Sequence, residues 1–487
     1  MDTSSNNLKK KAFSGVFWTL GERIGAQMVS MIVSIVLARI LMAEDYAPVS
    51  VVSIFFNFAT VFVTSGLNSA LIQKKDSTIT DYSTILYTSL GAAAVVYVIL
   101  FFTAPFIAAI YELPILIPLI RVMALSLIIN AVKSILSAFI SNTLQFKKLF
   151  ISTVVGTVIS AVVGIAMALN GFGAWALVAQ QMTNAVVSTI SLFITTKFVP
   201  RLTFSIKSFK ELFGYGWKIF VASIISEIYN ELNPLIVGLK FSSLDLSFYS
   251  KGHSFPVLLN GTITNTLSTV LFPVVSKVQN DLSAVLSITR RYIRVTTYVV
   301  FPIMCGFFAV SESFVKLILT EKWLPTVPYI QIFCISFMFN IIQTANLLSI
   351  KAIGRSDISL ILEIIKKASY FAIIAAFVFL SDSPIMLAIS SIACTVVATV
   401  VNTFPNRKLI GYKYRYQLAD ILPNLIISTI MLVVVLFMNK LPLPTAALFV
   451  LQIVAGAVVY VVLSIITKNE NFKYLLNTAK QVIRKEA

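Results

Sequence analysis

Apolar residues fill most of a long stretch near the start of the chain, and its polar residues fall on one helical face. At about 1.5 Å of rise per residue, residues 12–41 are long enough for a helix across a bilayer core of roughly 30 Å. Arg23 and Gln27 lie one turn apart, and Ser30 and Ser34 continue the same face. The pattern predicts a membrane helix with one face toward water or a polar ligand and the other toward lipid.

Two charged residues lie deep inside this predicted helix. If the helix enters the membrane near Phe13, Glu22 and Arg23 lie close to the midplane. An arginine there costs at least roughly 2.5–3.5 kcal/mol on insertion scales. The placement therefore calls for a partner or a function.

Similar apolar runs recur along the whole chain and predict fourteen membrane helices. The connecting segments are short, and none is large enough to fold around a core of its own. The predicted spans are 14–41, 48–72, 83–110, 116–141, 149–169, 173–195, 214–238, 248–274, 293–319, 326–350, 359–380, 384–404, 418–438 and 443–466.

Lysine and arginine alternate between the loops as the fourteen-helix arrangement requires. Twenty-six of them fall in segments on the side of the N-terminus, and only Lys240, Lys251, Lys322 and Lys440 fall on the other side. Cytoplasmic loops carry the excess of cationic residues in membrane proteins. We therefore predict that both termini are cytoplasmic.

Composition agrees with a polytopic membrane protein, because the chain is 58% hydrophobic and only 12% charged. The net charge of +18 reflects this loop asymmetry, so we expect no nucleic-acid partner. The basic segment after the sixth span is expected to lie along anionic membrane lipid. Cys305, Cys334 and Cys394 are far apart in apolar runs and indicate neither disulfides nor a metal site.

The two halves of the chain have related patterns about 200 residues apart. Gly15 to Trp18 precedes the first predicted helix as Gly214 to Trp217 precedes the seventh. Such repeats in transporters place the substrate path between the halves. The predicted organisation is an N-terminal lobe over 1–195, a basic linker over 196–213, a C-terminal lobe over 214–404, and two further helices with a tail over 405–487.

Polar stripes on several predicted helices suggest a hydrated cavity between the halves. Deep cations there would suit an anionic group such as phosphate. Candidate substrate-binding residues are Arg23, Gln27, Asn57, Asn68, Lys133, Glu227, Asn230, Asn260, Asn265, Lys366 and Lys367, and candidate coupling residues are Glu22, Glu231 and Glu363.

Two structural interpretations of the same residues remain open. A single Ser or Thr in a membrane helix usually bonds to its own backbone or holds two helices together. The deep charges could instead pair with one another, Arg23 with Glu22 or Glu227, and Glu363 with Lys366 or Lys367.

Signals of enzyme chemistry are nearly absent. The single histidine is His253, and the sequence contains no Walker motif, no H-E-x-x-H helix and no G-x-S-x-G elbow. We expect a transporter without cofactor, metal or catalytic residues, driven by an ion gradient, the membrane potential or the cargo gradient.

Several stretches resemble bacterial polysaccharide flippases of the multidrug/oligosaccharidyl-lipid/polysaccharide superfamily, in the O-antigen, capsule and exopolysaccharide branch. They lie in about the first 280 residues, and Ala47-Pro48 departs from the family, which more often has glycine there. The matching stretches are LARIL at Leu37 with Glu44 and Asp45, ALIQKKD at Ala70, GFGAWALV at Gly171, VPRLTF at Val199, FYSKG at Phe248 and LFPVVSKVQND at Leu271.

This resemblance implies an all-α fold of fourteen helices in two lobes around a V-shaped cavity. The implied cargo is an undecaprenyl-pyrophosphate-linked oligosaccharide, moved to the outer leaflet of the plasma membrane for surface polysaccharide synthesis. Arg23 would then bind the diphosphate. A polysaccharide polymerase complex is a possible partner.

Two alternatives differ in features that the sequence can test. A multidrug exporter of the same superfamily would be expected to bury an aspartate in an early helix, and the first helix has none. A membrane-embedded polymerase or ligase should carry a large external loop with Arg, His or Asp groups, and the external loops here are short.

Overall fold

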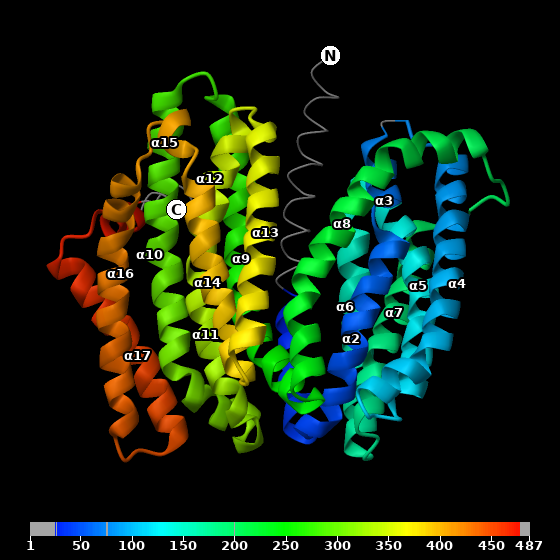
Figure 1. The fold of residues 1–487 in the computed structure, drawn as a ribbon, viewed down its shortest axis with the longest axis horizontal. Coiled ribbons are helices and arrows are strands. Elements are labelled where there is room, and N and C mark those ends of the chain that lie inside the picture. The colour runs from blue at the N-terminus through cyan, green and yellow to red at the C-terminus, as the bar shows by residue number, and fades with distance from the viewer. Residues whose placement is uncertain (1–24, 26, 75, 199, 478–487) are drawn as a thin grey trace, which may run out of the picture. The chain divides into compact units, whose positions relative to one another are not determined.

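The computed structural model describes residue 25 and residues 27–74, 76–198 and 200–477, except for the side chains of 262–270 and 272–274 in one long helix. These residues form helices joined by short turns and contain no strand. Contacts divide the chain after Ser247 into two compact units (Figure 1). The predicted all-α fold class is confirmed.

The continuously described part of the first unit starts in an apolar helix, Gln27–Ile40. Its most extensive contacts join α6 to α7, α4 to α5 and α5 to α7, so these four helices form the body of the bundle. The helices after the first are α2 (Ala43–Thr64), α3 (Leu67–Gln73), α4 (Ile79–Ile110), α5 (Leu116–Thr143), α6 (Phe146–Leu169), α7 (Ala174–Thr196) and α8 (Ile206–Lys240).

The second unit contains most of α9 (Ser243–Lys277) and everything that follows it. Its centre is α10, which packs against α11, α12, α16 and α17. Its elements are α10 (Leu282–Phe314), η1 (Val315–Leu319), η2 (Glu321–Thr326), α11 (Val327–Met338), α12 (Asn340–Ala352), α13 (Ser356–Leu380), α14 (Pro384–Thr403), α15 (Asn406–Leu409), α16 (Tyr414–Phe437), η3 (Met438–Lys440) and α17 (Thr445–Ile466).

Ten helical segments in the described chain are long and apolar enough to cross a membrane. Helices α8, α9 and α13 are also longer than 18 residues but are not among the ten. Helix α13 carries Glu363, Lys366 and Lys367, and α8 carries Glu227 and Glu231, all of which the sequence singled out. The count of fourteen spans stays a prediction.

The predicted single helix 48–72 is wrong, because the chain breaks between α2 and α3. Gly66 has φ +80°, a conformation that glycine adopts without the strain caused by a Cβ. A Cβ on Gly66 would also lie only 2.5 Å from the carbonyl oxygen of Gly216 in α8. The two glycines therefore let the start of α3 cross the backbone of α8 closely.

The segment between α7 and α8 is shorter than the predicted linker 196–213, since α8 begins at Ile206 with Ser205 as its N-cap. Two backbone N–H groups of the described part of this segment donate to α4. The backbone N–H of Arg201 donates to Ser83 Oγ at 2.9 Å, and that of Ser205 donates to Thr84 Oγ1 at 3.1 Å. In Figure 1 the first turns of α8 lie across the end of the bundle near α3 and α4.

Lys74, which follows α3 directly, links it to α4 and α8. Lys74 Nζ lies 3.2 Å from Asp81 Oδ1 of α4 and 3.1 Å from Glu211 Oε2 of α8. Burial opposes the charge of Lys74, but the hydrogen bonds to Glu211 and Asp81 outweigh it and raise its pKa. Lys74 of the ALIQKKD stretch therefore connects α4 with α8, which are far apart in the sequence.

The predicted helix 326–350 is likewise interrupted. It starts in the short helix η2, and the helix breaks at Phe339 between α11 and α12. The helices predicted to follow the second lobe, over 405–487, pack on α10 and lie in the same compact unit. The lobe boundaries themselves stay a prediction.

Candidate functional site

Small residues at every fourth position of α6 bring it close to α7. A Cβ on Gly156 would lie 2.9 Å from the Cβ of Ser188, and one on Gly164 would lie 2.8 Å from the Cβ of Gln180. Small side chains allow such close approach of membrane helices. The hydroxyls of Ser152 and Ser191 add a hydrogen bond of 3.1 Å between the same helices.

This packing forms one wall of a polar pocket of about 410 Å³ within the first unit. Pockets for small molecules typically have volumes of about 300–1,000 Å³. Among the described residues that line it, Lys133 is the charged one. The lining residues are Ser30, Phe56, Met123, Ser126, Asn130, Lys133, Thr157, Ser160, Gln180, Gln181, Asn184 and Ala185.

The pocket lies near the middle of the helices that form it. Lys133, Ser160 and Asn184 are each within a few residues of the midpoints of α5, α6 and α7. A lysine at such a depth is expensive unless polar groups surround it. The pocket supplies amides and hydroxyls, so it can hold a polar or anionic group within an otherwise apolar bundle.

Part of the polar lining is held by the protein itself. Ser126 and Ser160 donate to the backbone carbonyls of Met123 and Thr157. Asn184 Nδ2 makes long hydrogen bonds to Thr157 Oγ1 at 3.5 Å and to Ser160 Oγ at 3.4 Å. These bonds orient the wall before any ligand enters.

A second polar contact joins two predicted site residues from different stretches of the chain. Asn57 Nδ2 of α2 donates to Glu231 Oε1 of α8 at 2.8 Å. Glu231 is half-buried, whereas Asn57 and the neighbouring Asn230 are exposed. Glu227 lies one turn earlier on α8 and is half-buried. The structure therefore brings Asn57 and Glu231 together.

Replacing Glu231 separates its hydrogen bond from its charge. Glu231→Gln keeps an acceptor for Asn57 but cannot ionise, so transport should fall about tenfold if this carboxylate takes part in coupling, with the protein level unchanged. Asn57→Ala removes only the donor and should have a smaller effect. Transport is measured with purified protein in liposomes. Normal transport by Glu231→Gln would exclude a coupling role.

Some candidate residues make an ion pair or a hydrogen bond to a residue three or four positions earlier in the chain, the structural alternative that the sequence left open. In α13, Lys366 Nζ lies 2.7 Å from Glu363 Oε1, so these two residues form an ion pair, and Lys367 is half-buried on the next position. Asn68 donates to the carbonyl of Thr64 one turn earlier. Asn260 is buried in α9. Their roles in binding stay predictions.

Other candidate residues lie at the start of the described chain or outside it. Gln27 lies in the apolar helix before α2 and is half-buried. Glu22, Arg23 and the side chain of Asn265 lie outside the described residues.

Sequence reasoning found Lys133 but missed most of its neighbours. The polar residues Gln180, Gln181 and Asn184 of α7 were not recognised as a site, although QQMTN interrupts an otherwise apolar run. Two of them, Gln180 and Asn184, are one turn apart on a helix, and this spacing is the signal that could have found them.

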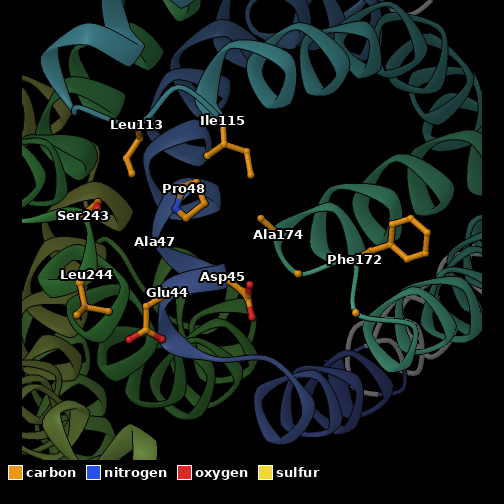
Figure 2. Close-up of a pocket in the computed structure, with 12 residues that line it drawn as sticks. Glu44, Asp45, Ala47, Pro48, Leu113, Ile115, Phe172, Ala174, Ser243 and Leu244 are labelled. Atoms are coloured by element: carbon orange, nitrogen blue, oxygen red, sulfur yellow. The ribbon is translucent and has the colours of Figure 1, made fainter.

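Two of the stretches that resemble the flippase family, the one with Glu44 and Asp45 and the one that begins at Gly171, line a second pocket of the first unit, of about 350 Å³ (Figure 2). Gly171 and Gly173 have φ +78° and +53°, and a Cβ on Gly173 would lie 2.6 Å from Asp45 Oδ1. Asp45 Oδ2 also accepts from the backbone N–H of Met42 at the start of α2. Figure 2 shows Asp45 facing the loop between Phe172 and Ala174. Close packing against Asp45 thus explains the second glycine of the GFGAWALV stretch, Gly173.

The departure at Ala47-Pro48 is accommodated in the same place. Pro48 lies inside α2, near its start, and both residues are buried while lining this second pocket. The predicted external turn before α2 is therefore short, and proline is tolerated because it falls close to the helix N-terminus.

Comparison with known proteins extends the resemblance beyond the first 280 residues. The succinoglycan biosynthesis transport protein ExoT of Rhizobium meliloti (strain 1021) is 23% identical over 97% of this chain and 96% of its own. The lipopolysaccharide biosynthesis protein WzxC of Escherichia coli (strain K12) is 24% identical over 87% of this chain and 88% of its own.

Solved structures with a similar fold include the lipid II flippase MurJ in its inward closed conformation. The match has a TM-score of 0.77 at 17% identity and covers 93% of this chain and 99% of that one. An inward-facing multidrug resistance transporter of the MATE family matches with a TM-score of 0.59 at 13% identity, over 80% of this chain and 98% of that one. The chain therefore shares the helical fold of these two transporters.

A family model described as polysaccharide biosynthesis protein matches residues 36–328, more than half of the chain. The resemblance drawn from the sequence motifs is therefore confirmed, and the chain belongs to the polysaccharide biosynthesis protein family.

Proposed function

We propose that this protein is a flippase, and not an enzyme, that moves a lipid-linked oligosaccharide to the outer leaflet of the bacterial inner membrane. The observation that carries the proposal is the polar pocket at the middle of α5, α6 and α7 in an otherwise apolar bundle. Sugars need hydrogen-bond donors and acceptors at that depth, because lipid offers none. The family and the names of the relatives support the same cargo class.

The finer parts of the proposal concern the carrier and the partners. We take the carrier to be undecaprenyl pyrophosphate, with Arg23 at the diphosphate, and a polysaccharide polymerase as a partner that receives the cargo. Arginine suits a phosphate because its guanidinium forms two parallel hydrogen bonds.

The direct test is movement of a fluorescent polyprenyl-diphosphate oligosaccharide by purified protein in liposomes. We expect the label to reach the opposite leaflet, where an impermeant quencher detects it, and protein-free liposomes to show only slow leakage. Efflux of a cationic dye without movement of this cargo would favour the multidrug exporter.

Both termini are proposed to be cytoplasmic, from the distribution of lysine and arginine between loops. Single cysteines at Lys10, Asp281 and Lys485 should resist an impermeant thiol reagent in intact cells, whereas one at Asn170 should react. The three native cysteines are buried and give a low background. The opposite labelling pattern would reverse the topology.

A further inference from the structure

Four cations follow one another closely in the segment 404–418 of the second unit, which runs from the end of α14 through α15 into the first turns of α16. Both long helices can cross a membrane, so this segment between them lies at one surface of the bilayer. The sequence has no Asp or Glu between Asp382 and Asp420. These four exposed residues, the loop cations, are Arg407, Lys408, Lys413 and Arg415.

Buried polar residues fix the backbone between the loop cations. Asn406 is fully buried, and its Nδ2 donates to the carbonyl oxygen of Asn346 at 3.1 Å and to Asn346 Oδ1 at 2.7 Å. The backbone N–H of the buried Tyr412 donates to the carbonyl of Asn406 at 3.0 Å. Gln417 Nε2 also donates to Asn346 Oδ1, at 3.1 Å. Binding of an anion therefore requires little further ordering of the chain.

The carboxylate that follows the segment is already used inside the unit. Asp420 accepts two hydrogen bonds from Arg290, each of 2.8 Å, and a third from Tyr412 Oη. The charge of Arg290 balances that of Asp420. The segment 404–418 therefore keeps an excess of positive charge, which attracts anions at a membrane surface.

Exposed apolar side chains flank the loop cations. Phe404 is 53% exposed and Leu418 is 63% exposed. The guanidinium of Arg407 lies 5.2 Å from the centre of the Phe404 ring, and that of Arg415 lies 5.5 Å from the centre of the Tyr416 ring. Cations beside aromatic and apolar side chains suit the headgroup level, where they reach phosphates and their neighbours reach acyl chains. A free phosphate would use the cations alone.

We propose that the segment 404–418 binds an anionic phospholipid of the leaflet that it faces, with the lipid phosphate at the loop cations and the acyl chains beside Phe404 and Leu418. Arginine can bind a phosphate through two parallel hydrogen bonds, and lysine binds it as a point charge. The bilayer supplies this ligand in bulk, so mass action favours it over the scarcer cargo. The inference goes beyond the proposed function and does not depend on it.

The test measures retention of lipid by the purified, full-length protein in detergent, with native mass spectrometry. Phosphatidylglycerol and phosphatidylcholine with the same acyl chains are added separately. The unmodified protein should bind phosphatidylglycerol about tenfold more tightly, and added salt should weaken this preference. A variant with all four loop cations changed to glutamine, R407Q/K408Q/K413Q/R415Q, should lose most of it.

A matched control removes the same charge from four other exposed cations of the second unit. They belong to α9, α10 and the segment after α17, and the sequence predicts them on the same side of the membrane as the loop cations. The control variant is K277Q/R291Q/K468Q/K473Q. It should keep most of the preference for phosphatidylglycerol. As a second readout, a phosphatidylglycerol with a photoreactive group near its phosphate should label peptides from the segment 404–418 in the unmodified protein.

Equal binding of the two lipids by the unmodified protein would overturn the proposal, even where the loop variant fails to fold. An equal loss of preference in the loop and control variants would also overturn it, because the preference would then reflect total charge. Displacement of phosphatidylglycerol by an equal concentration of inorganic phosphate would reduce the segment to a phosphate site. Displacement by an equal concentration of a polyprenyl diphosphate would assign the segment to the cargo instead.

Discussion

Replacing Asp420 with alanine is expected to destabilise the second unit strongly. Arg290 binds both oxygens of this carboxylate, from Nε and Nη2, each at 2.8 Å. Tyr412 Oη donates to the same carboxylate at 2.8 Å. The Asp420 side chain is 4% exposed, whereas that of Arg290 is 34% exposed. Removing one partner of a buried pair costs roughly 3–5 kcal/mol, and we expect about 3 kcal/mol because Arg290 retains access to water.

The control for Asp420→Ala is Glu470→Gln. Glu470 also pairs with an arginine of α10, since Arg294 Nη1 lies 3.3 Å from its Oε2, but its side chain is 85% exposed. Exposed pairs contribute little, so this change should be nearly neutral. Thermal unfolding in detergent should show a Tm several degrees lower for Asp420→Ala. Equal Tm values for the two variants would mean that the buried pair adds no stability.

This ion pair illustrates what the sequence could not provide. Arg290 lies in a segment that is predicted to be cytoplasmic, and Asp420 lies 130 residues further along the chain. Nothing in either local pattern indicates the other. The amide of Asn424 extends the same contact by donating to Thr297 Oγ1 and the carbonyl of Arg294. The sequence therefore predicted α10 and α16 as helices but not that polar bonds join them.

The positions of the helices were predictable because long apolar runs leave few alternatives in a bilayer. The breaks were not. Gly66 ends α2 because its φ is positive and its neighbour is the backbone of Gly216, which comes 150 residues later. Apolar residues continue on both sides of Phe339, so hydropathy shows no boundary between α11 and α12.

The candidate site was predictable in part for the same reason. Lys133 was found because a charge in a membrane helix is costly by itself, wherever the rest of the chain lies. Amides such as Gln180 and Asn184 cost less and were noticed only when the structure placed them beside it. The pairing of Asn57 with Glu231 also depends on packing, because α2 and α8 are far apart in sequence.

Loss of transport is the largest functional effect that we expect, and it is expected for Arg23→Ala. Arg23 is predicted to lie near the midplane on the polar face that continues through Gln27. If it binds the diphosphate, the alanine variant should insert normally and leave the lipid-linked oligosaccharide in the inner leaflet. Arg23→Lys keeps the charge but loses the two parallel hydrogen bonds, so partial transport should remain.

A structural ion pair with Glu22 or Glu227 makes a different prediction for the same variant. Removing the arginine would leave a carboxylate unpaired in the membrane, so Arg23→Ala should lower the amount of protein rather than only its activity. Neutralising the partner as well, with Glu22→Gln or Glu227→Gln, should then restore the protein. Membrane abundance and surface polysaccharide are measured for the single and double variants. Recovery of membrane abundance and surface polysaccharide in a double variant would assign Arg23 to an ion pair. If every variant that lacks Arg23 instead has normal abundance but makes no surface polysaccharide, the assignment of Arg23 to the diphosphate stands.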